Sequence, residues 1–322
     1  MRHNNKPAII RFLSSGLFRV LFSALIICWI VYRFQFGTII FNMWRADKML
    51  LACAVAIFMA SGALGAAQWS TLLRFHGITL GFPGTLARYF MGLFFNYILP
   101  GFVGGDVVRV YKTAVASGRS TQSFSSTLAD RVIGLLVLVV CSLAAFMLLP
   151  GGPADQALPA AGFMFFVLAG FLALFAFRRL GSVFALLFGR FIPIGISEKI
   201  SSVYEEMHLM TRSPATLIRV LALSCLIQLA RIGVHFVCGK AVGMQLGFTY
   251  FALFVPVMEI MASIPLSFGG VGVREMVGVG LFSAMGVPQE TVISYSLLAY
   301  AAGFTGAIPG AAAFVFGFGD RK

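Results

Sequence analysis

Two short stretches of the chain, residues 100–109 and 265–274, contain residue types that could together hold an anion. Each has a proline, a pair of glycines and an arginine at the same offsets. Glycine lets backbone N–H groups face a ligand without a Cβ in the way, and a helix that restarts there presents its positive end. An arginine about one turn further on can bind a phosphate through two parallel hydrogen bonds. The predicted anion-binding residues are Gly104, Gly105, Arg109, Gly269, Gly270 and Arg274.

Each stretch taken alone has a plainer explanation, a tight helix bend whose arginine reaches to the membrane interface. The repetition favours a function. An arginine at the same offset from a glycine pair is hard to obtain by chance, even in a chain with 35 glycines. We therefore predict an internal repeat.

Other polar side chains interrupt apolar segments, where a charge costs about 2.5–3.5 kcal/mol and needs a reason to be present. Arg231 shares one helical face with Gln228 and His235, at spacings of three and four residues. Glu259 stands alone in an apolar run, so we expect it to be buried and paired with Arg131 or Arg231.

Three more residues, Asn96, Asp130 and Arg131, complete the set of candidate ligand-binding side chains. For Asp130 and Arg131 the alternative is an ion pair that caps a helix start near the interface. For His235 the alternative is a packing role without any proton transfer.

The elements that must position these residues are membrane-spanning helices. The sequence is 59% hydrophobic and 11% charged, whereas soluble proteins contain about 25% charged residues. A transmembrane helix needs about 20 mostly apolar residues. Such runs recur near 13–32, 49–67, 125–149, 159–177, 214–238 and 292–316. We predict an all-α, polytopic membrane helix bundle that forms a single transmembrane domain over residues 1–322.

Two further apolar segments, 84–108 and 249–286, are each broken by proline and glycine. Such breaks free backbone groups that lipid cannot satisfy, so this backbone must be buried in protein or line a wet cavity. We expect two re-entrant hairpins. Because three spans separate them, they would enter from opposite faces as an inverted repeat with halves of about 49–177 and 214–316. Two true crossings would instead give a parallel repeat.

The excess of 24 Lys and Arg over 11 Asp and Glu could suggest nucleic acid. The basic residues are scattered over short loops, however, which favours a topology signal with anionic lipid headgroups as partners and no nucleic acid. Basic residues near the N-terminus and in the 178–213 connection place both on the cytoplasmic side, together with the C-terminus. The connection is either an amphipathic interfacial segment or an ordinary cytoplasmic loop helix.

Motifs of common enzymes are missing from the sequence. We find no Gly-x-Ser-x-Gly elbow, no His-Glu-x-x-His and no Walker loop. The five cysteines lack Cys-x-x-Cys spacing. We therefore expect no catalytic residue of a conventional hydrolase, no metal and no cofactor.

Three pieces of sequence resemble the lysylphosphatidylglycerol synthase transmembrane family, which is also described as flippase-like. They are residues 96–109, Asp130 to Gly134, and residues 264–275. The resemblance implies a bacterial inner-membrane protein that moves lipids, or helps to move them, between leaflets. Fused members also have an aminoacyl-transferase domain, which this sequence lacks. It looks like a stand-alone version, similar to members linked to hopanoid or glycolipid pathways, and the resemblance does not fix the substrate.

The leading hypothesis is a lipid transporter for an anionic phospholipid, a polyprenyl phosphate or a glycolipid. The hairpin tips would meet around a polar cavity, related by a pseudo-two-fold axis in the membrane plane, and the headgroup would be held by Arg109, Arg131, Arg231 and Arg274. Replacing Arg109 or Arg274 by alanine should then weaken transport more than folding.

Two alternatives stay open. One is a membrane-embedded transferase that acts on lipid headgroups, with Asp106, Glu259 or His235 as acid or base. The other is a non-catalytic partner of a lipid-biosynthesis enzyme.

Overall fold

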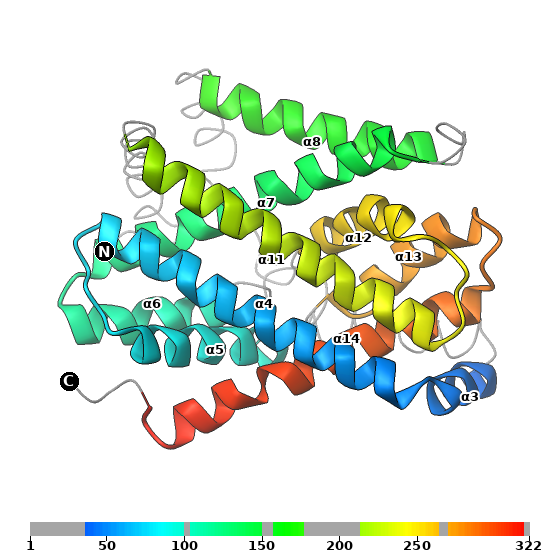
Figure 1. The fold of residues 1–322 in the computed structure, drawn as a ribbon, viewed down its shortest axis with the longest axis horizontal. Coiled ribbons are helices and arrows are strands. Elements are labelled where there is room, and N and C mark those ends of the chain that lie inside the picture. The colour runs from blue at the N-terminus through cyan, green and yellow to red at the C-terminus, as the bar shows by residue number, and fades with distance from the viewer. Residues whose placement is uncertain (1–35, 100–103, 150–156, 177–212, 264–269, 319–322) are drawn as a thin grey trace, which may run out of the picture.

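The computed structural model describes residues 36–99, 104–149, 157–176, 213–263 and 270–318, and every long element among them is a helix (Figure 1). The all-α prediction is confirmed. In chain order the helices are α3 (Phe36–Arg45), α4 (Lys48–Phe75), α5 (Phe82–Ile98), α6 (Gly104–Ser117), α7 (Ser120–Met147), α8 (Leu158–Ala176), α11 (Pro214–Ala241), α12 (Phe248–Ser263), α13 (Val273–Ser283) and α14 (Gln289–Val315).

Four of the predicted spans correspond to helices long and apolar enough to cross a membrane, namely α4, α7, α11 and α14. The predicted span near 159–177 is α8, whose described part is a shorter apolar helix. The predicted first span, 13–32, and the 178–213 connection lie outside the described residues.

Neither broken segment forms one continuous helix. Residues 84–108 fall in α5 and α6, and residues 249–286 fall mainly in α12 and α13. The breaks themselves, 100–103 and 264–269, are outside the described residues. In Figure 1, α5 and α6 lie toward one end of the long helices, and α12 and α13 toward the other.

The order of helix lengths repeats along the chain. Helices α4 to α7 have 28, 17, 14 and 28 residues, and α11 to α14 have 28, 16, 11 and 27. The packing repeats as well, because α14 packs against α4 and α5 while α7 packs against α11 and α12. Helices α4 and α11 pack against each other with opposite chain directions (Figure 1).

Capping residues and positive-φ glycines set several helix starts. Asp47 accepts hydrogen bonds from the backbone N–H groups of Met49 at 2.8 Å and Leu50 at 3.2 Å, and so caps α4. Gly118, with φ of 69°, makes the turn between α6 and α7. Helix α7 consequently begins at Ser120 and not near 125.

Small residues allow close approach between helices, as is common in membranes. A Cβ on Gly105 of α6 would overlap the carbonyl oxygen of Gly92 in α5. A Cβ on Gly310 of α14 would likewise overlap the carbonyl oxygen of Phe90. The backbones of α5, α6 and α14 are therefore in direct contact. This contact fixes the helix pair α5–α6, the first hairpin, against the bundle; the pair α12–α13 is the second hairpin.

Aromatic packing holds the second hairpin. The ring of Phe282 in α13 lies 5.1 Å from those of Phe251 and Phe254 in α12, and 5.3 Å from that of Tyr295 in α14. Aromatic pairs at such distances contribute about 0.5–1.5 kcal/mol beyond their buried area. The contact of α13 with its neighbours is thus made mainly by side chains, in contrast to the backbone contact of α6.

Candidate functional site

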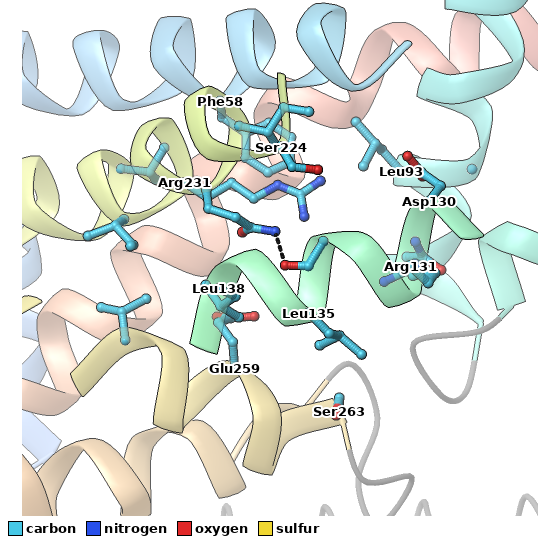
Figure 2. Close-up of a pocket in the computed structure, with 18 of the residues that line it drawn as sticks. Phe58, Leu93, Asp130, Arg131, Leu135, Leu138, Ser224, Arg231, Glu259 and Ser263 are labelled. Atoms are coloured by element: carbon cyan, nitrogen blue, oxygen red, sulfur yellow. Dashed lines mark hydrogen bonds between the residues drawn. The ribbon is translucent and has the colours of Figure 1, made fainter. Parts of the chain in front are cut away.

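A cavity of about 200 Å³ lies among helices α4 to α7 and α11 to α14 (Figure 2). It is lined by residues of α4, α5, α6, α7, α11, α12, α13 and α14. Its lining contains four arginines and three carboxylates: Arg109, Arg131, Arg231, Arg274, Asp106, Asp130 and Glu259. All four arginines predicted to face one polar cavity are therefore brought together.

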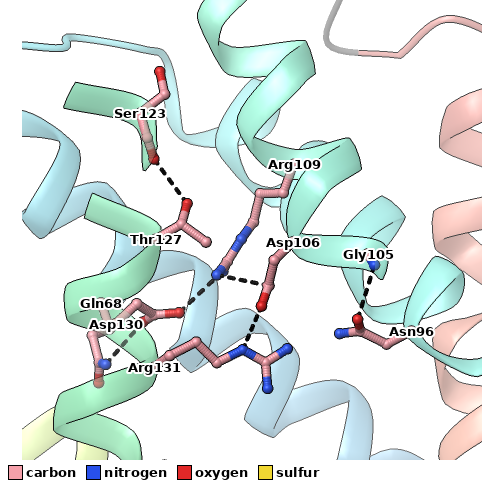
Figure 3. Close-up of polar contacts among 9 residues, drawn as sticks. All are labelled: Gln68, Asn96, Gly105, Asp106, Arg109, Ser123, Thr127, Asp130 and Arg131. Carbon is pink, nitrogen blue, oxygen red and sulfur yellow. Dashed lines mark hydrogen bonds and ion pairs between the residues drawn. The ribbon is translucent and has the colours of Figure 1, made fainter. Parts of the chain in front are cut away.

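The first cluster surrounds Arg109 of α6 (Figure 3). Its guanidinium contacts Asp130 of α7 at 3.0 Å and Asp106, one turn earlier on α6, at 3.2 Å. The same guanidinium lies over the rings of Trp69 at 4.7 Å and Tyr89 at 4.9 Å. With 4% of its side chain exposed, Arg109 is surrounded by protein and balanced by two carboxylates.

Both aspartates of this cluster have further partners. Arg131 Nε donates to Asp106 Oδ2 at 2.6 Å. Gln68 Nε2 donates to Asp130 Oδ1 at 2.9 Å, and Ser224 Oγ donates to Gln68 Oε1 at 2.8 Å. The chain of contacts thus links α6, α7, α4 and α11, four helices that are distant in sequence.

The alternative reading of Asp130 and Arg131 as a helix cap is wrong. Asp130 lies in the interior of α7, which begins at Ser120. The two residues also have different partners, Arg109 for the aspartate and Asp106 for the arginine. Helix α7 has serine-rich first turns before its apolar run, so it begins earlier than the predicted span near 125–149.

The second cluster surrounds Glu259 of α12. Arg274 of α13 approaches it through Nε at 3.0 Å and donates through Nη2 at 3.4 Å. His235 of α11 approaches the same carboxylate through Nε2 at 3.4 Å. Arg274 also lies over the ring of Tyr300, at 5.8 Å. The Glu259 side chain is 28% exposed, so this carboxylate is more open to solvent than Asp106 or Asp130 of the first cluster.

The predicted pairing of Glu259 with Arg131 or Arg231 is wrong. Its partner is Arg274, because α13 packs against α12. Glu259 is half-buried and not fully buried as expected. The expectation that it lies within ion-pair distance of an intramembrane arginine is nevertheless confirmed.

Of the glycine N–H groups predicted to form anion cradles, that of Gly105 has a partner within the protein, and so has the nearby N–H of Gly272. The N–H of Gly105, in the first turn of α6, donates to Asn96 Oδ1 at 2.9 Å. The N–H of Gly272, before α13, donates to Glu275 at 2.5 Å. These two donors are therefore engaged by the chain itself. Gly104 begins α6, Gly270 adopts φ of 73° before α13, and Gly269 lies outside the described residues.

Arg231 differs from the other three arginines. Its side chain extends from α11 into the cavity (Figure 2), on the same helical face as Gln228 and His235, which also line it. Among the described residues, no carboxylate lies within ion-pair distance of Arg231. Since three arginines face three carboxylates, Arg231 supplies the unbalanced positive charge of the lining.

Several residues of the site were not identified from the sequence. Gln68 and Ser224 are buried and connect the first cluster to α11, and Trp69 and Tyr89 cover Arg109. A glutamine inside the long apolar run of α4 was the available signal. Within the described part of the chain, no group of three or more His, Cys, Asp and Glu residues is arranged to hold a metal.

The sequence matches one family model and is similar to two known membrane proteins. Residues 16–310 match the family model of the lysylphosphatidylglycerol synthase TM region. A UPF0104 membrane protein of Pyrococcus horikoshii is 31% identical over 108 residues, which cover 33% of this chain and 32% of the relative. A UPF0104 membrane protein of Methanothermobacter thermautotrophicus is 24% identical over 325 residues, which cover 92% of this chain and 89% of the relative. These relatives are archaeal, so the similarity extends beyond bacteria.

Proposed function

From the premise that this chain belongs to the lysylphosphatidylglycerol synthase transmembrane family, we propose that it is a lipid transporter that moves an anionic headgroup between membrane leaflets. The headgroup occupies the cavity between the two hairpins while the hydrophobic tails stay in lipid. A cavity of about 200 Å³ suits a headgroup and is far too small for a lipid with its tails.

The observation that carries the proposal is the unbalanced charge of Arg231. An arginine inside a membrane protein normally has a partner or faces a water-filled cavity that serves transport. Arg231 lines such a cavity and has no carboxylate partner among the described residues. A bound anion completes its pairing. Arg131, whose side chain is 35% exposed, and the amide of Asn96 are close enough to the same space to contribute.

The architecture that supports transport is a pair of re-entrant hairpins, α5–α6 and α12–α13, that enter from opposite faces. The two halves, about 49–177 and 214–316, form an inverted repeat in this proposal. Three observations support it: the repeated helix lengths, the matching packing partners and the opposite directions of α4 and α11.

Transport then requires that the cavity open toward one leaflet at a time and bind the headgroup with different free energies in the two states. The repeat provides two such states, because exchanging the conformations of its halves exchanges the open side. The protein resides in the cell membrane with both termini on the cytoplasmic side, and the drive is a gradient or mass action.

The test is leaflet exchange in reconstituted vesicles. Wild-type protein should exchange a fluorescent phosphatidylglycerol faster than protein-free vesicles and faster than it exchanges phosphatidylcholine. Arg231→Gln should slow the exchange by about 10- to 100-fold, since a hydrogen bond to a charged group contributes about 1.5–3 kcal/mol. Arg219→Gln is the matched control, because Arg219 is an exposed residue of the same helix outside the cavity lining.

The same assay separates the alternatives. A transferase that uses Asp106, Glu259 or His235 would alter the chemical structure of the labelled headgroup, which mass spectrometry of the extracted lipid detects. A non-catalytic partner of a lipid-biosynthesis enzyme would neither exchange nor alter the lipid. Exchange of unaltered lipid that Arg231→Gln leaves unchanged would contradict the proposed role of the cavity.

A further inference from the structure

We infer that His235 is a proton-binding site, and that a proton and the anion occupy the cavity together, so that a pH gradient drives transport. This inference rests on the proposed function, because the proton accompanies the anion of the same cavity. It adds the coupling ion and the residue that binds it.

His235 of α11 lies on the cavity wall among charged side chains. Its side chain is 11% exposed, and its Nε2 lies 3.4 Å from Glu259 Oε1. Arg231 is one helical turn earlier on the same face, and the side chains of Arg231 and Glu259 both line the cavity (Figure 2). Histidine is the side chain whose ordinary change of charge falls between about pH 5 and 8. His235 is therefore the member of this group that can change its charge at physiological pH.

The ionisable groups that face His235 come from several helices. Glu259 faces it from α12, and Arg274 of α13 lies on the other side of that carboxylate, at 3.0 Å. From α14, the ring of Tyr295 lies edge-on to the imidazole at 6.2 Å, and its hydroxyl donates to Met258 Sδ. A tyrosine stays neutral over this pH range. Glu259 is thus the nearest group that responds to a charge on His235.

The other two helices that pack against α11 add no charge at this point of the wall. Helix α4 has its charged residues at its two ends, Lys48 and Arg74. On α7, Asp130 and Arg131 are held in the first cluster. Among the described residues, Glu259 is the only carboxylate within ion-pair distance of His235.

The proton binds to the histidine and not to the carboxylate beside it. Arg274 carries a permanent positive charge next to Glu259, so a proton on Glu259 would leave a buried arginine uncompensated. A proton on His235 instead faces an ionised carboxylate, which favours the charged imidazole. The pair Glu259–Arg274 therefore stays charged while His235 changes.

In the present state His235 is neutral, because a second N–H would have no acceptor. The neutral ring has one N–H, which Nε2 directs toward Glu259. Nδ1 is enclosed by protein and has no hydrogen-bond partner among the described residues. A hydrogen on Nδ1 would be buried and unsatisfied, which is unfavourable. Proton uptake therefore accompanies a movement that admits water to Nδ1: a hydronium ion gives its proton to this nitrogen and leaves as water.

A bound anion makes this change favourable. Without an anion, a charged His235 and Arg231 would be two like charges one turn apart in a medium of low dielectric constant. An anion at Arg231 removes this repulsion, and by thermodynamic reciprocity the proton strengthens anion binding by the same factor. One proton and one singly charged anion then cross together. No net charge moves, and a pH gradient drives the exchange whereas a membrane potential does not.

The experiment measures the leaflet distribution of a short-chain fluorescent phosphatidylglycerol, by extraction with albumin, in vesicles that contain the protein. With about pH 8 inside and about pH 6 outside, wild-type protein should shift the lipid to the inner leaflet by at least about 10-fold relative to protein-free vesicles. At equal pH, a potassium gradient of about tenfold with valinomycin should leave the wild-type distribution unchanged, because no net charge moves.

The variant His235→Gln keeps a side-chain N–H for Glu259 but cannot take up a proton. We expect it to exchange lipid without responding to the pH gradient, and to redistribute lipid by up to about tenfold under the potassium gradient. His76→Gln is the matched control and should behave as wild type, because His76 follows α4 and does not line the cavity. Thermal unfolding verifies that both variants are folded, and the two wild-type measurements decide the question if His235→Gln is not.

The outcomes separate this inference from the proposed function. Wild-type protein that redistributes lipid under the potential but not under the pH gradient overturns proton coupling and leaves transport intact. A response of His235→Gln to the pH gradient equal to that of wild type overturns the assignment to His235.

Absence of any exchange would refute transport, and calorimetry of the purified protein in detergent then tests the proton site alone. Binding of dihexanoyl phosphatidylglycerol, compared in buffers of different ionisation enthalpy, should take up about one proton per lipid and be about 10-fold tighter at about pH 6 than at about pH 8. Both effects should be lost in His235→Gln. Wild-type protein that takes up no proton, whether or not it binds the lipid, overturns the inference.

Discussion

The two hairpins each place an arginine at the same offset in the sequence, yet the arginines have different surroundings. Arg109 contacts two aspartates and lies over two aromatic rings, with 4% of its side chain exposed. Arg274 is buried to nearly the same degree, with 6% of its side chain exposed, but it faces a single carboxylate, which is 28% exposed and shared with His235. The two arginines at the same offset thus have unequal numbers of partners.

The two hairpins also differ in how their helices pack, through backbone in the first and through side chains in the second. Helix α6 touches α5 through backbone at Gly92 and Gly105. Helix α13 meets α12 largely through side chains, with the end of Met258 lying over Gly278. A backbone contact cannot adjust, whereas a methionine side chain can. The comparison indicates that the first hairpin is held rigidly by backbone contacts. In the proposed transport cycle, we expect the second hairpin to be the one that moves.

The largest expected effect on stability is that of Arg109→Ala. The substitution leaves Asp130 and Asp106 short of a cation in a buried cluster, and removing one partner of a buried ion pair costs about 3–5 kcal/mol. Thermal unfolding of the purified variant in detergent measures the loss. The earlier expectation that Arg109→Ala weakens transport more than folding is thereby revised.

The double variant Arg109→Met, Asp130→Leu is the matched control for that prediction. It removes both charges of the closest pair and should recover part of the lost stability. If the double variant is less stable than the wild type by the sum of the losses of Arg109→Met and Asp130→Leu, the pair is not coupled and the fixed character of the first hairpin is refuted.

The next effect compares two glycines at the hairpin contacts. Gly105→Ala should destabilise the protein by about 1–3 kcal/mol, because the new Cβ overlaps the backbone of Gly92. Gly278→Ala should change stability by about 1 kcal/mol or less, because only the flexible end of Met258 must move. Gly280→Ala, with open space at the Cβ, is the neutral reference. Equal losses at Gly105 and Gly278 would remove the difference between the hairpins.

A smaller loss of stability is expected for Arg274→Ala. The Glu259 side chain is half-buried and keeps His235 as a neighbour, so the variant should lose about 1–2 kcal/mol, which is less than the loss at Arg109. The rate of leaflet exchange should fall by a larger factor than this loss of stability explains, because the cluster around Glu259 has lost its arginine. A loss of stability as large as that of Arg109→Ala would show that both clusters are structural.

The smallest effect is expected at Ser142 of α7. Its hydroxyl donates to the carbonyl oxygen of Leu253 at 2.9 Å, a hydrogen bond that joins α7 to α12. Ser142→Ala should cost about 0.5–1 kcal/mol, as is typical of hydrogen bonds between membrane helices. No measurable loss would mean that water satisfies the carbonyl equally well.

Features that depend on local sequence could be predicted well. The long apolar runs gave α4, α7, α11 and α14, because the thickness of the bilayer sets the length of an apolar helix. Proline and paired glycines marked the breaks between α5 and α6 and between α12 and α13. The helical spacing of Gln228, Arg231 and His235 placed them on one face, and all three line the cavity.

Features that depend on tertiary contacts could not be predicted in the same way. Four arginines were available to Glu259, and only the folding of α13 onto α12 selects Arg274. Gln68 and Ser224 lie 156 residues apart, and the sequence around neither residue predicts the hydrogen bond between them. Asp106 appeared in the sequence as an acid or base candidate, whereas in the structure it joins Arg109 to Arg131.

Side-specific thiol labelling tests the central claim, that two unequal hairpins enter the membrane from opposite faces around one cavity. Ala116, near the end of α6, and Ala284, just after α13, are both exposed and occupy corresponding places in the two hairpins. Each is replaced by cysteine in a chain whose five native cysteines are alanine, and the vesicles are treated with a membrane-impermeant maleimide. We expect the two cysteines to be labelled from opposite sides of the membrane. Labelling of both from the same side would contradict the inverted arrangement and, with it, transport through the cavity.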